Sequence, residues 1–275
     1  MPEPVSLHFF DFGTRPNGKI RTFAYEMKKR ILQEYSAHLK RPMAIRVYGT
    51  GGVPVIAFPT QDGMADQWEG FGMTEALREW LETRQIQLFT VDTVDIRTWS
   101  NKHARKDFRA RMQEAYFRWV TEEVQPMVRK VNGGPALPLL TGCSMGGAHS
   151  ALCLLRRPDL FSGTVSLSGS YDCRFFTGGY TDPLWLQNSG ADVLKTADAG
   201  TIDLLRTRSI VLCCGRGKNE EIELDATRIL EKDLIDNNIP AWVDYWGEDV
   251  DHDWVWWKPQ LRYFLPYVLD EINSR

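Results

Sequence analysis

The sequence predicts an α/β protein, a three-layer αβα sandwich in which a mostly parallel central sheet lies between layers of helices. Short apolar runs alternate along the chain with longer helical patterns, which is typical of parallel strands joined by crossover helices. No internal repeat, low-complexity tract or long linker divides the chain, so we expect a single domain over residues 1–275. A chain of 275 residues buries enough surface to hold such a core without disulfides or a metal.

The apolar runs are predicted to be the buried strands of the sheet. In chain order they are Val53–Phe58, Gln87–Val91, Leu137–Thr141, Gly163–Leu167, Ser209–Cys214 and Trp242–Trp246. Ahead of them, the stretch Ile31–Tyr48 is broken at Lys40-Arg41-Pro42, which predicts an antiparallel hairpin.

Helical patterns fall between these runs. The predicted helices are Thr74–Thr83, Asp107–Lys130, Ala148–Arg156, Asp225–Asn237 and Pro259–Ile272. The basic residues from Lys102 to Arg111 are expected to form a solvated helix face. Five of the ten tryptophans lie between residues 242 and 257, where we expect packing in the core and at its rim. The alternative is an aromatic wall of a substrate pocket.

Residues 172–205 differ from the rest of the chain. They contain Gly178-Gly179, Pro183 and no long periodicity, so we interpret Asp172–Leu205 as an insertion that follows a strand. In this architecture such an insertion lies over the carboxyl edge of the sheet and shapes the pocket. A solvent loop without a function is the alternative.

Charge and cysteine content argue against several classes of protein. The chain carries 33 Lys and Arg against 36 Asp and Glu, so it lacks the basic excess of a nucleic-acid partner. Five cysteines without a C-x-x-C pair predict neither a disulfide framework nor a metal site. The N-terminal sequence MPEPVSLHFFDFG has no signal-peptide pattern, and no apolar segment has membrane-helix length. We expect a cytoplasmic protein with no nucleic-acid or membrane partner, and a homo-oligomer is left open.

The decisive motif is Gly142-Cys143-Ser144-Met145-Gly146, which fits G-x-S-x-G. An apolar strand precedes it and a helical pattern follows it, which is the strand–turn–helix setting of a nucleophile elbow. The turn is so sharp that the serine takes a strained backbone and side chains at the two glycine positions would collide with it. Ser144 is therefore the predicted nucleophile. The N-terminus of the following helix is expected beneath the serine, and the amide of Met145 is the expected first oxyanion donor.

A second oxyanion donor is expected from the loop after Val53–Phe58, because this loop leaves the sheet at the same edge as Ser144. The loop reads Pro59-Thr60-Gln61-Asp62-Gly63. The backbone N–H of Gln61 or of Asp62 suits the role, and the sequence does not decide between them.

Of the five histidines, His252 has the position of a general base. It follows the last predicted strand and precedes a helix, where the histidine stands when the order is Ser, acid, His. His149 lies one turn into the helix after the serine and is expected to point away from it. His8 and His38 lie before or within the N-terminal strands, and His103 lies in a basic run.

The acid that orients this histidine is expected after the strand Ser209–Cys214, at the same edge of the sheet. Glu220 and Glu221 are the candidates in that loop, whereas Asp225 is expected to lie in the next helix. Asp172, after the preceding strand, is a weaker alternative. A glutamate suffices chemically because it needs only to hold the tautomer of the imidazole and stabilise its cation.

These segments carry a resemblance to a known family. Gly142–Gly147 with its helix, Ser168–Asp172, and Asp244–Gly247 running into Asp251–Trp254 resemble the putative-esterase family, which includes esterase D-type hydrolases and mycolyltransferases. The likeness extends from about Ile31 to Tyr267.

The resemblance implies one α/β-hydrolase domain with little or no separate lid, no cofactor and a Ser–acid–His triad. By position it implies Ser144 as nucleophile, His252 as base and Glu220 as acid. The acid loop varies in length between branches of the family, so Glu221 stays an alternative.

Motif and resemblance together predict a serine esterase that hydrolyses a small-molecule carboxylic ester through an acyl-enzyme. One alternative is an acyltransferase with the same triad, which products formed with an added acceptor alcohol would reveal. The other is a non-catalytic binding protein with a hydrolase fold, which would not react with a fluorophosphonate probe.

Overall fold

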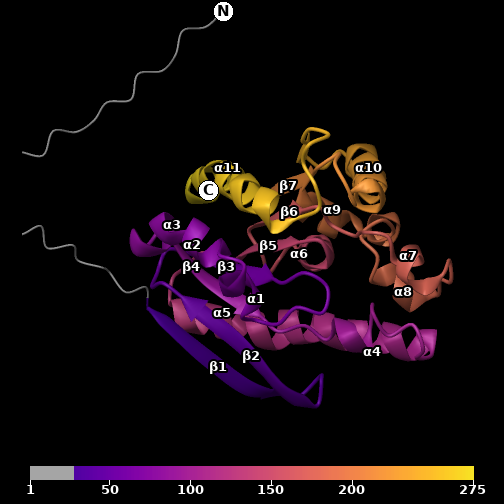
Figure 1. The fold of residues 1–275 in the computed structure, drawn as a ribbon, viewed down its shortest axis with the longest axis horizontal. Helices are drawn as coiled ribbons and strands as arrows, with labels where there is room; N and C mark the ends of the chain where they lie inside the picture. Colours follow the sequence, from indigo (N-terminus) through magenta and orange to yellow (C-terminus); the bar gives the residue numbers. More distant parts are fainter. Residues whose placement is uncertain (1–27) are drawn as a thin grey trace, which may run out of the picture.

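The computed structural model describes residues 28–275. The N-terminal stretch MPEPVSLHFFDFG, for which no signal peptide is expected, therefore lies outside the described residues, and so does His8. Eight strands form one sheet in the order β1-β2-β4-β3-β5-β6-β7-β8 (Figure 1). The strands are β1 (Lys29–Ser36), β2 (Arg41–Tyr48), β3 (Val53–Phe58), β4 (Ile86–Val91), β5 (Leu139–Cys143), β6 (Gly163–Leu167), β7 (Ser209–Cys214) and β8 (Trp242–Tyr245).

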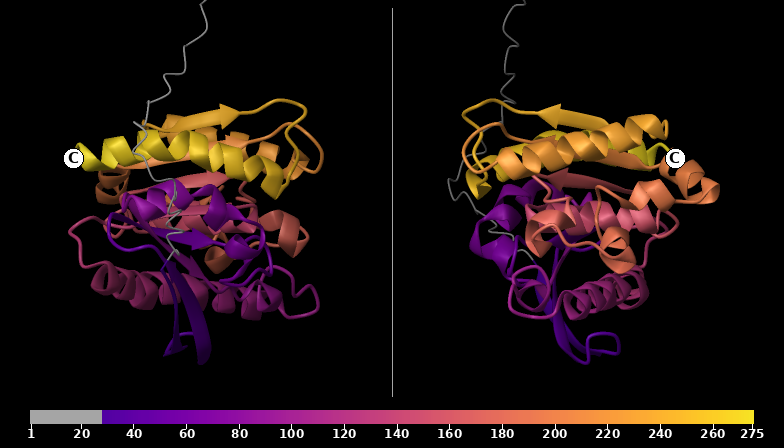
Figure 2. Two further views of the ribbon diagram at one scale, coloured as in Figure 1. Left: turned by 60° about the vertical axis from the view of Figure 1, so that its left-hand side comes forward. Right: turned by 90° about the vertical axis from the view of Figure 1, so that its right-hand side faces the viewer.

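The predicted α/β class with a mostly parallel sheet is confirmed. Strands β3 to β8 pair with one another only in parallel. Strands β1 and β2 form the expected antiparallel hairpin, which joins the sheet by antiparallel pairing of β2 with β4. The hairpin makes one end of the sheet and β8 the other (Figure 2). Strands β3 to β7 are buried along their whole length, because helices cover both faces of the sheet.

Eleven α-helices in the described part of the chain make up the outer layers and the connections. They are α1 (Gln67–Gly70), α2 (Met73–Ala76), α3 (Arg78–Glu82), α4 (Lys106–Arg118), α5 (Gln125–Asn132), α6 (Met145–Arg156), α7 (Cys173–Thr177), α8 (Pro183–Gln187), α9 (Ala199–Leu205), α10 (Glu221–Asp236) and α11 (Trp254–Asn273). None of the helices in the described residues has the length and apolar character needed to span a bilayer.

Alternate side chains of each strand enter two separate cores. Along β3, Val55 and Ala57 face the layer of α1, α2, α3 and α11, whereas Ile56 and Phe58 face the layer of α4, α5, α6 and α10. The sheet therefore holds both helical layers, and the residues that follow its strands project from a rigid frame.

Several element boundaries differ from the sequence prediction. Strand β5 ends at Cys143, so the chain turns at Ser144 directly into α6, which begins three residues before the expected Ala148. Helix α11 begins at Trp254 and not at Pro259, because the Asp253 side chain accepts a hydrogen bond from the amide of Val255 and caps the helix. Helix α10 begins at Glu221, before the expected Asp225.

Two predicted helices are interrupted. The segment expected as Thr74–Thr83 is split into α2 and α3 at Leu77. The segment expected as Asp107–Lys130 is helical from Lys106 to Asn132 but contains a π-helical turn at Trp119–Val124, which places an extra residue in the helix.

The prediction of a fully solvated basic face is wrong at Arg109. Its side chain is 2% exposed and donates hydrogen bonds to the carbonyls of Thr98, Trp99 and Phe176. The guanidinium group supplies several donors at once, so it satisfies loop carbonyls that would otherwise be buried without partners. The basic neighbours Lys102 and Arg105 are exposed as expected.

Segment 172–205 forms short helices and not an irregular loop. Trp185 of α8 donates its indole N–H to the carbonyl of Lys106, and Phe176 of α7 packs against Trp99. The segment thus rests on the start of α4 and on the chain before it. Its role in shaping a substrate pocket remains a prediction, as does the single-domain organisation of the chain.

Candidate active site

Ser144 stands in the sharp turn between β5 and α6. Its φ is 57° and its ψ is −126°, a strained backbone for a residue with a side chain. A Cβ at Gly142 would lie 2.2 Å from the carbonyl oxygen of Gly146, and one at Gly146 would lie 2.3 Å from that of Pro59. Both glycines are therefore required by close backbone approaches, as the motif predicted.

His252 lies against this serine. Its Nε2 is 2.8 Å from Ser144 Oγ, although the two residues are 108 positions apart in the sequence. The loop between β8 and α11 carries the imidazole to the carboxyl edge of the sheet, and the amide of His252 donates to the carbonyl of Lys218. The hydroxyl and the imidazole are thus within proton-transfer distance.

Glu220 meets the other nitrogen of the ring. Its Oε2 is 3.1 Å from His252 Nδ1, and the residue is 1% exposed. Glu221 is the exposed first residue of α10 and has no such contact. The carboxylate of Asp172 instead caps α7 and pairs with Arg174. Among the candidate acids, the structure brings only Glu220 to the histidine.

Ser168 and Cys214 hold this glutamate directly and Trp257 holds Ser168, three contacts that no motif in the sequence indicates. Ser168 donates its hydroxyl to Glu220 Oε1 over 2.6 Å, and Trp257 donates its indole N–H to Ser168 Oγ over 3.1 Å. The thiol of Cys214 donates to Glu220 Oε2 over 3.4 Å. Burial, together with the nearby charge of Glu220, raises the pKa of this thiol, so it stays protonated. Both carboxylate oxygens therefore have partners before they meet His252.

The surroundings of His252 increase its affinity for a proton. Burial by itself lowers the pKa of the imidazole, but the hydrogen bond and negative charge of Glu220 raise it. The charges of Glu223 and Asp253 add to it, and the pKa lies above the ordinary value of 6.5. The Trp257 ring packs edge-on against the imidazole, with centroids 4.9 Å apart, and fixes its plane.

The loop after β3 passes directly over the start of α6. The approach of Pro59 to Gly146 places it there, and a turn follows in which the amide of Gly63 donates to the carbonyl of Thr60. This bond does not use the amides of Gln61 and Asp62, the two predicted oxyanion donors. Met145 is the first residue of α6, so its amide has no acceptor within the helix.

The hydroxyl of Ser100 fixes the conformation of this turn. It accepts from Gln61 Nε2 over 2.6 Å and contacts both carboxylate oxygens of Asp62, at 2.8 and 2.7 Å. Asp62 has a left-handed φ of 61°, which is unfavourable for a residue with a side chain. Ser100 follows β4, so two adjacent strands determine the shape of the loop.

His149, on α6, is not a member of this site. It is 2% exposed, and its Nε2 lies 3.0 Å from Oδ1 of the fully buried Asp95. This contact ties α6 to the turn after β4. His38 lies beside Glu122, and His103 is exposed, in agreement with the expectation that neither is the base.

Two groups in the described residues have a geometry that could hold a metal. One is Asp172, Cys173 and Asp192, and the other is Glu220, Glu223 and His252. In the first, both carboxylates already pair with Arg174. In the second, Glu220 and Glu223 accept from Ser168 and Ser170, and His252 contacts Glu220 and Ser144. The carboxylates and the imidazole of the two groups therefore have protein partners.

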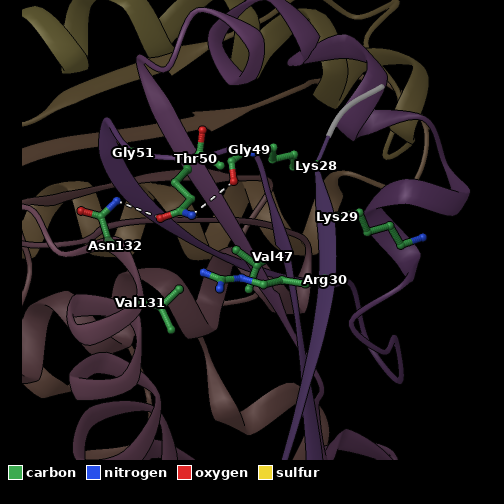
Figure 3. A pocket seen from close by; sticks show the side chains of 10 residues that line it. Lys28, Lys29, Arg30, Val47, Gly49, Thr50, Gly51, Val131 and Asn132 are labelled. Atoms are coloured by element: carbon green, nitrogen blue, oxygen red, sulfur yellow. Dashed lines mark hydrogen bonds between the residues drawn. The ribbon is translucent and has the colours of Figure 1, made fainter. Parts of the chain in front are cut away.

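A hollow of about 510 Å³ lies at the opposite edge of the sheet (Figure 3). It is lined by the turn before β3, including Thr50, and by Arg30 and Asn132. Asn132 bonds Gln87 at the start of β4. Because these residues precede the parallel strands while Ser144 follows one, the hollow lies away from the edge that carries Ser144.

Comparison with known proteins agrees with the observed fold. The family model described as "Putative esterase" matches residues 36–267. The comparison with curated proteins gives no match.

Solved structures are similar over nearly the whole chain. A ferulic acid esterase has a TM-score of 0.71 and 16% identity, and the match covers 90% of this chain and 100% of that one. An S-formylglutathione hydrolase from Agrobacterium tumefaciens has a TM-score of 0.69 and 14% identity, over 90% and 97%. A ferulic acid esterase from the anaerobic fungus Anaeromyces mucronatus has a TM-score of 0.64 and 13% identity, over 92% and 94%. At these identities the likeness shows the fold, that of α/β-hydrolases.

Proposed function

The chain belongs to the putative-esterase family and is a carboxylic ester hydrolase; from that premise we propose that it acts through an acyl-enzyme formed on Ser144, with His252 as base and Glu220 as acid. The observation that carries the proposal is the pair of contacts made by one imidazole. Its Nε2 lies 2.8 Å from Ser144 Oγ and its Nδ1 lies 3.1 Å from Glu220 Oε2.

In the first half-reaction, His252 Nε2 removes the proton of the Ser144 hydroxyl as the oxygen attacks the ester carbonyl carbon. The negative charge of Glu220 keeps the proton on Nδ1, so that Nε2 is the free base, and stabilises the imidazolium that forms. The tetrahedral intermediate then collapses. His252 gives its proton to the leaving alkoxide, and the acyl group stays on Ser144.

In the second half-reaction a water molecule takes the place of the alcohol. His252 removes a proton from the water, and the hydroxide attacks the carbonyl carbon of the acyl-enzyme. The carboxylic acid product is released as His252 returns the proton to Ser144. Support for the oxyanion site comes from the free amide of Met145 and from the turn that carries Gln61 and Asp62. The charge on the carbonyl oxygen develops between these two segments.

The cysteines support a reducing compartment, such as the cytoplasm, as the location. Cys143, Cys153, Cys173, Cys213 and Cys214 are all free thiols, and all are buried. Free cysteines in this number are common in compartments that keep thiols reduced.

The experiment is a panel of esters with short, long and aromatic acyl groups, to which a thiol ester is added. The aromatic and thiol-ester members are chosen because proteins of similar fold are a ferulic acid esterase and an S-formylglutathione hydrolase. We expect the wild type to hydrolyse esters of the panel. We also expect a fluorophosphonate to label it once, at Ser144. A Ser144→Ala protein that hydrolyses the same ester at the wild-type rate would overturn the proposal.

The same panel separates hydrolysis from acyl transfer. With an acceptor alcohol added, a hydrolase releases mainly the free acid, whereas a transferase forms mainly the new ester. A chain that turns over none of the esters and is not labelled by the fluorophosphonate would be a binding protein.

A further inference from the structure

A second buried carboxylate lies beside His252, next to that of Glu220. Glu223 stands in the first turn of α10, three residues after Glu220, and is 9% exposed. One oxygen of each glutamate and one ring nitrogen of His252 all lie within 4.8 Å of one another. The mechanism above uses only one of these two carboxylates.

The turn after β6 holds both glutamates in the same way. Ser168 donates its hydroxyl to Glu220, and Ser170 donates its hydroxyl to Glu223 Oε1 over 2.8 Å. Between them, a Cβ at Gly169 would lie 2.4 Å from the ring of Tyr171, so a glycine is needed for this turn. One tight turn thus presents two serines to two carboxylates on the adjacent helix.

We propose that Glu223 is a positioning residue of the catalytic centre, whose carboxylate faces His252 beside Glu220 and stabilises the imidazolium formed when Ser144 loses its proton. The inference rests on the proposed function, because it gives Glu223 a part in the same proton transfer. Glu220 fixes the tautomer through its bond to Nδ1. Glu223 acts on His252 through its charge.

The charges around the imidazole agree with these separate roles of Glu220 and Glu223. The groups that raise the proton affinity of His252 are Glu220, just before α10, Glu223 in the first turn of α10, and Asp253 before α11. Burial raises the pKa of Glu223 and the charge of Glu220 adds to this, whereas His252 and Ser170 lower it. Asp253 is exposed and its carboxylate caps α11, so the second buried charge is that of Glu223.

The test is a nuclear magnetic resonance titration of the His252 ring in Ser144→Ala protein, which needs no enzymatic activity. The resonance is assigned by its loss in a His252→Gln variant. Glu223→Gln removes the charge but keeps the size and an acceptor for Ser170. The matched control is Glu221→Gln, which removes an exposed charge from the same helix turn. Glu223→Met, of similar volume, replaces the Gln variant if that variant does not fold.

We expect Glu223→Gln to lower the pKa of His252 by about one unit, the usual effect of an opposite charge at this range. Glu221→Gln should leave it near the wild-type value. In protein with Ser144 intact, the acidic limb of kcat/KM should move to lower pH by the same amount.

The inference is overturned if Glu223→Gln shifts the pKa of His252 no more than Glu221→Gln does. It is also overturned if the pKa of His252 shifts but the acidic limb of kcat/KM does not. Failure of the proposed function is distinguishable. In that case Ser144→Ala would not reduce ester turnover, whatever the titration shows.

Discussion

Ser168 Oγ lies 2.6 Å from Glu220 Oε1, in a contact that joins the turn after β6 to the start of α10. The hydroxyl also accepts the indole N–H of Trp257, so its own proton is directed at the carboxylate. Glu220 is 1% exposed, and water cannot take the place of this donor without a rearrangement. The orientation of the carboxylate is therefore set by a serine of another strand's loop.

Ser168→Ala should lower kcat by roughly tenfold with little change in KM, because a hydrogen bond to a charged group contributes about 1.5–3 kcal/mol, part of which is lost. Steady-state kinetics on the best ester of the panel checks this. Ser162→Ala is the control, since the Ser162 hydroxyl is buried without a partner among the described residues. Equal kcat for the two variants would contradict a role for Ser168.

Ser144→Ala should reduce ester turnover by about 10⁴-fold or more while the protein stays folded, as loss of a triad nucleophile does. Circular dichroism and thermal unfolding check the fold, and fluorophosphonate labelling should disappear. A pure variant that keeps more than about a tenth of wild-type kcat would show that another group is the nucleophile.

Glu220→Gln should cut kcat by about 10²–10⁴ with little effect on KM, because the amide cannot hold the tautomer and charge that His252 needs. Glu221→Gln and Asp172→Asn are the matched comparisons. Glu221 is exposed and Asp172 caps α7, so each should stay within a few-fold of wild type. If Glu221→Gln loses its kcat while Glu220→Gln keeps a value near wild type, Glu221 and not Glu220 is the acid.

The reaction should depend on a single ionisation whose pKa lies above 6.5. Burial lowers the pKa of His252, but Glu220, Glu223 and Asp253 together raise it by more, and the general base acts only when neutral. kcat/KM should therefore rise with pH through this raised value and fall about tenfold per unit below it. A pH–rate profile measured at constant ionic strength gives the value. A midpoint below 6.5 would mean that burial outweighs the charges.

Gly146→Ala should destabilise the protein by about 1–3 kcal/mol and reduce activity, because the new Cβ would lie 2.3 Å from the carbonyl oxygen of Pro59. The backbone of α6 meets the end of β3 there and cannot move aside easily. Urea unfolding gives the change in stability. Gly70→Ala is the control, because a Cβ there has no atom within 4 Å. Equal stability of both variants would refute the close approach.

Much of the architecture and the local setting of Ser144 followed from the sequence alone. The burial pattern of β3 to β7 and the G-x-S-x-G turn are set within a few residues, so the pattern of apolar side chains and glycines predicts them. The helix starts at Met145 and Trp254 were missed, because each depends on a turn or a cap and not on periodicity.

The surroundings of the site depend on contacts that no local pattern encodes. Ser168 and Trp257 are 89 positions apart, and Asp95 and His149 are 54 apart. The buried Arg109 lies in a run that reads as solvated, because its three carbonyl acceptors come from other segments.

Sequence patterns predict the sheet, the elbow with Ser144, the candidate base His252 and the short loop that holds Glu220 and Glu221. Only the folded structure shows that Glu220 and not Glu221 faces the imidazole, and it brings Ser168, Trp257 and Glu223 to the pair. The difference arises because a backbone turn is fixed by its own few residues. The direction of a buried side chain depends instead on hydrogen-bond partners that the fold brings from distant strands and helices.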